Sequence, residues 1–174
     1  MCSSDLLASC IERQGGSVVS MDVSVLGDPP APVAISKHLV AEAAGSSIAQ
    51  AIAAGDENKA MQIMAHGASA IVRKLHADKL IDGLIAMGGT MGTDLALDCA
   101  RVLPVGVPKY IISTVSFSPL IPADRLSADI QMILWAGGLY GLNAICKSAL
   151  SQAAGAVLGA ARAVEPPAGD QPVV

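Results

Sequence analysis

The sequence predicts an α/β domain, a three-layer sandwich built on a mostly parallel, Rossmann-like sheet. Two observations lead to this fold class. Short apolar runs at 84–87, 109–115 and 129–134 have the length and composition of strands that are buried on both faces. Between such runs, apolar residues recur every three or four positions, as they do in amphipathic helices. Strands that alternate with helices form parallel sheets with helices packed on the faces.

The composition fits one such domain with an aliphatic core. The chain has 174 residues, of which 52% are hydrophobic but only 2% aromatic, so aliphatic side chains and close alanine–glycine contacts must fill the core. The net charge of −4 argues against nucleic acid as a partner. The longest apolar stretches, around 133–145 and 153–161, are too short and too interrupted by glycine to span a bilayer, so we expect no membrane partner.

The cysteines and the N-terminus favour a cytoplasmic protein. Residues 1–5 lack the basic start of a signal peptide. The four cysteines are scattered without a C-x-x-C pair, which indicates neither a disulfide framework nor a zinc site and suits a reducing compartment. His66 and His76 are ten residues apart and do not share a helical face, so the sequence predicts no metal site built from protein side chains.

The chain begins with a predicted helix and strand. Residues 5–14 carry an apolar stripe and end at a glycine pair, as a short helix does, and residues 17–23 have the composition of a strand. Asp22 stands near the C-terminal end of this strand, the end at which ligands gather in parallel sheets. Asp22 is therefore either part of a ligand site or only a cap for the following loop.

Two helical segments follow this strand. Residues 35–54 have a helical pattern that is interrupted at Gly45, where Ser46 and Ser47 can cap a second short helix. Residues 56–80 keep one apolar stripe throughout, which predicts a single long amphipathic helix that begins after Asp56.

The stretch from 83 to 94 carries the strongest functional signal. After the apolar run 84–87, three glycines let the backbone turn sharply and leave its N–H groups uncovered: Gly88, Gly89 and Gly92. Thr90 and Thr93 can each cap the helix that follows. A strand, a glycine-rich turn and a helix N-terminus together hold phosphate, because free amides and the helix dipole both favour an anion. Alternatively, the turn is glycine-rich only because α/β connections are short, and its spacing matches neither the Walker A motif nor G-x-G-x-x-G.

Hydroxyl groups at the end of the next strand extend this candidate site. Ser113 and Thr114 stand at the C-terminal end of the run 109–115, where they can complete a phosphate or ribose pocket or merely cap local turns. After the strand 129–134 we expect a flexible glycine joint at 137–141 and a last amphipathic helix at 142–163.

An ordered series of motifs resembles the Tm-one-like ATP-binding family, which is named for a tomato protein that confers resistance to a tobamovirus. The motifs span roughly residues 5–163: Met21-Asp22-Val23, Ile81-Asp82-Gly83, Gly88-Gly89-Thr90-Met91-Gly92-Thr93, residues 103–109, Ser113-Thr114, Ser127-Ala128-Asp129-Ile130 and Gly141-Leu142-Asn143. The resemblance implies that residues 1–163 form the N-terminal domain of a two-domain protein. The three prolines after Glu165 predict a disordered tail at 164–174. The resemblance also implies that the phosphates of ATP face Gly88, Gly89, Thr90, Gly92, Thr93, Ser113 and Thr114.

The sequence departs from the family pattern at two places. The resemblance begins at the helix after the family's first strand, so we expect an open sheet edge that a second copy, a second domain or another chain covers. After the Ser-Thr pair, the family has a turn of small residues that includes an acidic one. This chain instead has Ser116-Phe117-Ser118-Pro119, where Phe117 would crowd the position and no acidic residue is present.

These observations favour a nucleotide-binding module without chemistry of its own. Mg²⁺ would be held mainly by phosphate oxygens, with Asp22 or Asp94 as a candidate carboxylate. One alternative is an enzyme that acts on a phosphorylated or acyl small molecule, with Asp22 or Asp129 as a base, although no catalytic signature is present. The other is an assembly or interaction domain that has lost the pocket.

Overall fold

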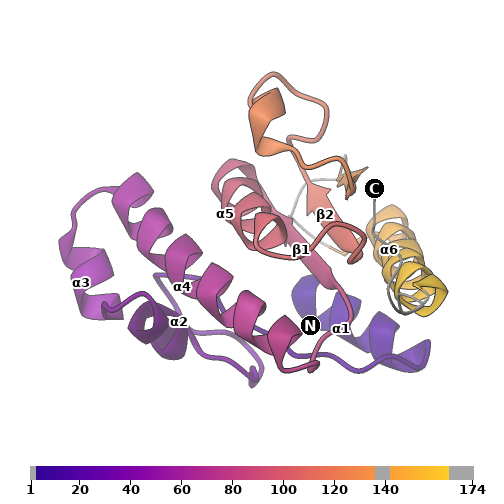
Figure 1. Cartoon of the computed structure of the whole chain (residues 1–174), viewed down its shortest axis with the longest axis horizontal. Helices are drawn as coiled ribbons and strands as arrows, with labels where there is room; N and C mark the ends of the chain where they lie inside the picture. Colours follow the sequence, from indigo (N-terminus) through magenta and orange to yellow (C-terminus); the bar gives the residue numbers. More distant parts are fainter. Residues whose placement is uncertain (1–2, 136–141, 165–174) are drawn as a thin grey trace, which may run out of the picture.

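A parallel sheet of three strands lies between helices in the computed structural model, which describes residues 3–135 and 142–164 (Figure 1). The strands are β1 (Leu84–Gly88), β2 (Lys109–Ser113) and β3 (Ile130–Leu134), in the order β1-β2-β3. Both pairings are parallel, and the register aligns the strand ends, so that Gly88 lies opposite Ser113 and Ser113 opposite Leu134. The predicted α/β fold with a parallel sheet is confirmed.

The helices flank this sheet. In the described residues they are α1 (Ser3–Arg13), α2 (Lys37–Ala43), α3 (Ile48–Ala53), α4 (Glu57–Ala77), α5 (Thr90–Arg101) and α6 (Ala144–Ala163), with a short 3₁₀ helix, η1 (Ala123–Arg125). Each predicted helical segment is present, and the segment 35–54 is divided around Gly45 as expected, with Ser47 capping α3. Gly45 has φ +70°, a left-handed conformation that glycine adopts without strain.

Helices α1 and α6 pack together against one face of the sheet. The apolar stripe of α1, including Leu7 and Ile11, and Leu150 of α6 belong to the same cluster as Ile112 of β2. Ile85 and Met87 of β1 pack against this cluster. Because side chains alternate along a strand, the intervening residues of β1 face the opposite layer.

The opposite layer is built outward from α5. Leu97 and Ala100 of α5 are buried against Ile111 of β2, and α4 packs beside α5 (Figure 1) in a cluster that Leu84 of β1 also contacts. The outer helix α2 approaches α4 closely at Gly67, where an added Cβ would lie only 1.8 Å from the carbonyl oxygen of Val40. The contact between these two helices therefore requires glycine at this position.

The predicted strand at 17–23 is wrong. Only an isolated parallel bridge forms there, between Met21 and Ile35, with hydrogen bonds from the Asp22 amide to Ile35 and from the Ile35 amide to Ser20. Nevertheless, Val18 packs against the α1–α6 layer, whereas Met21 packs against the α4–α5 layer. The segment thus alternates between layers as a strand does, but no ladder joins it to β1 in the described residues.

Among the described residues, three free cysteines are buried, each on a different helix: Cys10 on α1, Cys99 on α5 and Cys146 on α6. Burial of the Cys99 thiol, together with the nearby charge of Asp98, outweighs a hydrogen bond from Ser69 and raises the pKa of Cys99 to about 11.

Helix α6 is long and apolar enough to cross a bilayer by length and composition alone, a criterion that core helices of soluble proteins also meet. It packs against α1 through Leu150 and Ala153. The predicted glycine joint at 137–141 and the predicted disordered tail lie outside the described residues, apart from Val164.

Candidate functional site

Strand β1 passes into α5 through a single residue, Gly89, which is the N-cap of the helix. The expected caps Thr90 and Thr93 are wrong, because the chain turns so sharply that both threonines already belong to the first turn of α5. No side chain caps α5, whereas the side chains of Ser36, Ser47, Asp56 and Asn143 cap α2, α3, α4 and α6. The first amides of α5 thus have no acceptor among the described residues, and the positive end of the helix dipole is unopposed there.

The structure explains glycine at only one of the three glycine positions in this turn. An added Cβ at Gly88 would lie 2.7 Å from the Cα atom of Gly92, so Gly88 is required by the close crossing of strand and helix. At Gly89 the nearest atom to an added Cβ would be Thr114 Oγ1 at 3.7 Å, and at Gly92 it would be the Met87 carbonyl oxygen at 3.8 Å. These are ordinary contacts, and neither residue has a positive φ. Packing therefore does not explain Gly89 or Gly92.

Thr93 and Ser113 lie beneath the turn and bind each other. Their hydroxyl oxygens are 2.6 Å apart, both residues are buried, and the Val115 amide also donates to Ser113 Oγ. This pair joins the first turn of α5 to the end of β2. The structure thus brings both predicted residues to the site, in a position where their hydroxyls already have partners.

Thr90 and Thr114 are more accessible than this pair. Thr90 is exposed, and Thr114 is half-buried, with its amide donating to the Gly88 carbonyl at 3.2 Å. Together with the buried pair Thr93 and Ser113 and the three glycines, they form one cluster where β1 and β2 end. The sequence-predicted residues other than Asp22 are therefore neighbours in space.

Asp22 caps a local turn. Its Oδ1 accepts a hydrogen bond of 2.9 Å from the Ser24 amide, whereas Oδ2 is buried without a partner among the described residues. Asp22 lines neither of the cavities described below, although its neighbour Val23 lines one of them. The capping interpretation of Asp22 is thus supported, and its role in ligand binding stays a prediction.

Asp129, the other candidate base, lies just before β3, at the opposite end of the strands from the turn. Its carboxylate forms an ion pair with the buried Lys109 ammonium and accepts hydrogen bonds from the Gly106 amide and the Ser127 hydroxyl. Burial alone would raise the pKa of Asp129, but these interactions outweigh it and hold the pKa below its usual value. The observed contacts of Asp129 are structural.

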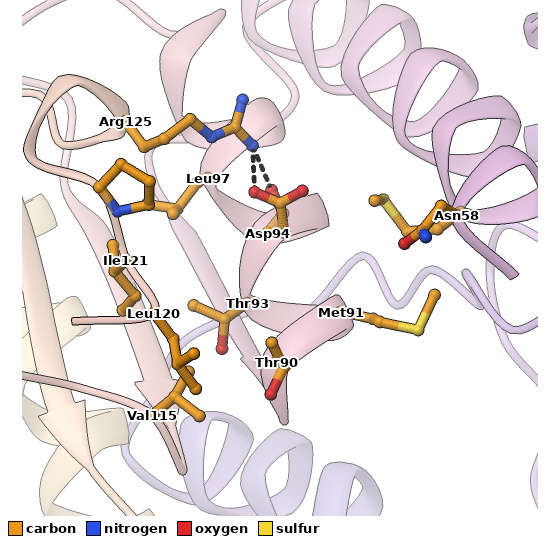
Figure 2. Close-up of a pocket in the computed structure, with 12 residues that line it drawn as sticks. Asn58, Thr90, Met91, Thr93, Asp94, Leu97, Val115, Leu120, Ile121 and Arg125 are labelled. Carbon is orange, nitrogen blue, oxygen red and sulfur yellow. Dashed lines mark hydrogen bonds and ion pairs between the residues drawn. The ribbon is translucent and has the colours of Figure 1, made fainter. Parts of the chain in front are cut away.

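A cavity of about 470 Å³, here called the Arg125 cavity, adjoins the start of α5 (Figure 2). It lies between the start of α4, α5 and the loop that follows β2, and its lining residues are Asn58, Met61, Thr90, Met91, Thr93, Asp94, Leu97, Val115, Leu120, Ile121, Pro122 and Arg125. Figure 2 shows Met91 extending from the first turn of α5 towards Asn58 of α4.

Arg125 is the charged residue that sequence reasoning missed. Its guanidinium lies 2.6 Å from Asp94 Oδ1 and also donates to the Asp94 carbonyl oxygen (Figure 2). It lies 2.8 Å from Asp98 Oδ1 as well. Burial lowers the pKa of Arg125, but the two carboxylates outweigh this effect and raise it above its ordinary value. Asp94, a candidate Mg²⁺ ligand, is thus already paired with a cation.

A second cavity of about 550 Å³, here called the Ile52 cavity, opens on the other side of Met91. It lies between residues 23–26, the turn from α3 to α4, and the first turn of α5. Its lining residues are Val23, Ser24, Val25, Leu26, Ala51, Ile52, Gly55, Asp56, Glu57, Ala60, Met61, Met91, Gly92 and Leu95. Within the described part of the chain, no group of three His, Cys, Asp or Glu side chains has a metal-binding arrangement.

The fold and this site define a class: a parallel α/β domain in which a strand enters a helix through a glycine turn, with cavities at that junction. The chain belongs to the UPF0261 family. The family model described as "Uncharacterised protein family (UPF0261) N-terminal domain" matches residues 3–166.

Bacterial UPF0261 proteins match almost the whole chain. A relative from Brucella suis is 57% identical over 97% of this chain, and one from Clostridium tetani is 34% identical over 94%. The chain spans about two fifths of the length of these curated relatives, 40% and 41% respectively. The ToMV resistance protein Tm-1(GCR237) of Solanum lycopersicum is more distant, 31% identical over 58% of this chain and 13% of the tomato protein.

Proposed function

We propose that this domain binds a nucleotide, with ATP as the first candidate, and that the phosphates lie on the turn between β1 and α5. The observation that carries the proposal is the pair Gly89 and Gly92, which packing does not require, at a helix start without a side-chain cap. Glycine is less favourable than alanine in a helix by about 1 kcal/mol, so Gly92 has a stability cost that close approach of a ligand to the backbone would explain.

The electrostatics of this turn favour an anion. The start of a helix carries about half a positive charge, and free amides there can donate hydrogen bonds to phosphate oxygens. The described protein side chains offer no metal-binding group, so Mg²⁺ would be held mainly by the phosphates, with Asp22 or Asp94 contributing one carboxylate at most. The resemblance to the Tm-one-like ATP-binding family supports ATP over other anions.

The test is a ligand titration that compares wild-type protein with Gly92→Asp. Gly92 is the third residue of α5, where a carboxylate satisfies the free amides and interacts favourably with the helix dipole. The variant should therefore fold at least as well as wild type while its carboxylate occupies the proposed phosphate position. We expect Mg-ATP at a hundred times its Kd to stabilise wild type by about 2.7 kcal/mol, and Gly92→Asp to lose this effect.

Gly159→Asp is the matched control. Gly159 is an exposed helical glycine in α6 with no atom within 4 Å of an added Cβ, and the substitution changes the net charge equally. The control should retain the ATP-induced stabilisation. If Gly92→Asp binds ATP as tightly as this control, the phosphate site is not on the β1–α5 turn, and an assembly or interaction domain becomes the better interpretation.

A further inference from the structure

The Ile52 cavity shares its wall with the proposed phosphate site. Met91 and Gly92, which belong to the first turn of α5, line this cavity. A ligand whose anionic group lies on the α5 amides can therefore extend directly into the cavity. Its volume of about 550 Å³ is within the range of small-molecule sites, which is about 300–1,000 Å³.

The walls of the Ile52 cavity suit an uncharged, flat group. Apolar side chains line much of the cavity, among them Val23, Val25, Leu95 and two methionines, Met61 and Met91. Methionine is adaptable, and its sulfur makes favourable contacts with aromatic rings. Ile52 and Leu26 are 52% and 75% exposed, so apolar surface remains uncovered at this cavity.

The charges around the cavity orient such a ligand. Asp56 and Glu57, both exposed, lie at the cavity, and Asp56 already caps α4 by accepting from the Lys59 amide at 2.9 Å. These carboxylates repel a phosphate, and the capped start of α4 does not need one. The uncapped start of α5 favours the phosphate instead.

We infer that the Ile52 cavity binds the base of the nucleotide, a flat and uncharged heteroaromatic ring, with Met61 and Met91 against the ring and the phosphates at the start of α5. This inference rests on the proposed function. The carboxylates of Asp56 and Glu57 would accept hydrogen bonds from the nucleoside, whose donors are the exocyclic amine and the ribose hydroxyls.

The experiment measures the Kd of Mg-ATP, of Mg-tripolyphosphate and of adenosine for wild type and for Ile52→Glu. The matched control is Leu39→Glu: Leu39 is 51% exposed on α2, does not line the cavity, and gives the same change in net charge. A second cavity variant, Leu26→Glu, serves if Ile52→Glu does not fold.

We expect wild type to bind ATP at least tenfold more tightly than tripolyphosphate, because only ATP carries a base. Ile52→Glu should weaken ATP binding about tenfold relative to Leu39→Glu, because a carboxylate in an apolar cavity is unfavourable to a ring. The affinity of tripolyphosphate should be the same in both variants.

Other outcomes separate the two proposals. Equal wild-type affinity for tripolyphosphate and ATP would overturn the base site while the phosphate site stands. Binding of adenosine and ATP with equal affinity, lost in Ile52→Glu but kept in Gly92→Asp, would overturn the phosphate site instead. Absence of binding by all three ligands would overturn both.

Discussion

The hydroxyl groups of Thr93 and Ser113 illustrate how a side chain predicted at a site can serve the fold beneath it. Their buried hydrogen bond of 2.6 Å fixes the first turn of α5 to the end of β2. Any ligand at the turn would contact backbone that this hydrogen bond holds in place. Sequence reasoning identified both residues, but their mutual contact depends on the register of α5 over β2, which the sequence alone does not reveal.

This pair leads to the first prediction. Thr93→Val keeps the shape of the side chain but removes its buried hydrogen bond to Ser113, whose hydroxyl then keeps only the Val115 amide as a partner, and this loss costs about 1–3 kcal/mol. We expect the free energy of unfolding, measured with urea, to fall by this amount. Thr90→Val, at an exposed position in the same helical turn, is the control and should change stability little. Equal effects at both positions would show that the buried bond contributes nothing.

The buried Lys109 gives a second prediction at the same scale. Asp129→Asn should destabilise the fold by about 3 kcal/mol at pH 7, because it leaves a buried ammonium without its counter-charge. The pKa of Asp129 is lowered in the folded state, so its contribution to stability is complete above the unfolded value of about 3.9 and is lost as the pH falls through the lowered pKa.

The difference between wild type and Asp129→Asn should therefore shrink in acid. Urea unfolding at pH 7 and near pH 3 measures this difference directly. A difference that stays constant over this range would contradict the ionic role of the pair.

At the scale of elements, the contact of α4 with α2 makes a third prediction. Gly67→Ala would place a Cβ 1.8 Å from the Val40 carbonyl oxygen, so one helix must shift, and overpacking of this kind costs about 1–3 kcal/mol or more. We expect thermal unfolding to show clear destabilisation, although alanine favours helix formation. Gly159→Ala in α6 meets no neighbour within 4 Å and should instead stabilise the protein by up to about 1 kcal/mol. Stabilisation by both substitutions would show that α2 can move away without cost.

Most elements were predictable because they depend on local patterns. The long stripe of α4, the break at Gly45 and the apolar runs of β1 to β3 are readable from spacing and glycine placement. The segment 17–23 was not, because a strand exists only when a neighbour completes its ladder, and no local pattern specifies that neighbour. Helix α5 begins earlier in the chain than predicted, because Gly89 is its N-cap and the two threonines expected to cap it lie inside the helix.

For the whole molecule, the open side of β1 is the main feature. The Leu84 amide donates to the Pro108 carbonyl, and the Gly88 carbonyl accepts from the Thr114 amide. Because alternate residues of a parallel strand bond to the same neighbour, the Ile85 and Met87 amides point away from β2. No acceptor for these two amides is found in the described residues. We propose that another chain, a second copy or a further domain covers this edge.

This geometry gives a fourth prediction. In the isolated chain, hydrogen exchange resolved by NMR should be faster at the Ile85 and Met87 amides than at the Ala86 amide, which faces β2. A bound partner that extends the sheet should slow exchange at the first two and leave Ala86 unchanged. Equal protection of all three in the monomer would indicate that the edge is already closed.

The candidate site was only partly predictable at this scale. The glycine turn and its hydroxyl neighbours are visible as a sequence motif that follows a strand. Arg125 and both cavities are not, because they arise where the loop after β2 and the turn before α4 approach α5 from opposite sides. Asp94 and Arg125 are 31 residues apart, and only the tertiary fold pairs them.

The buried cysteines supply the molecule with internal reporters of opening. The thiolate is the form of cysteine that attacks alkylating reagents, and the Cys99 thiol, with a pKa of about 11, is both protonated and covered at neutral pH. Modification of Cys10 or Cys146 therefore requires α1 or α6 to separate from the layer that it forms against the sheet, whereas modification of Cys99 requires α5 to separate from α4. Single-cysteine versions of the protein would time the release of α1, α5 and α6 one by one, and a ligand held at the start of α5 should delay the labelling of Cys99 most.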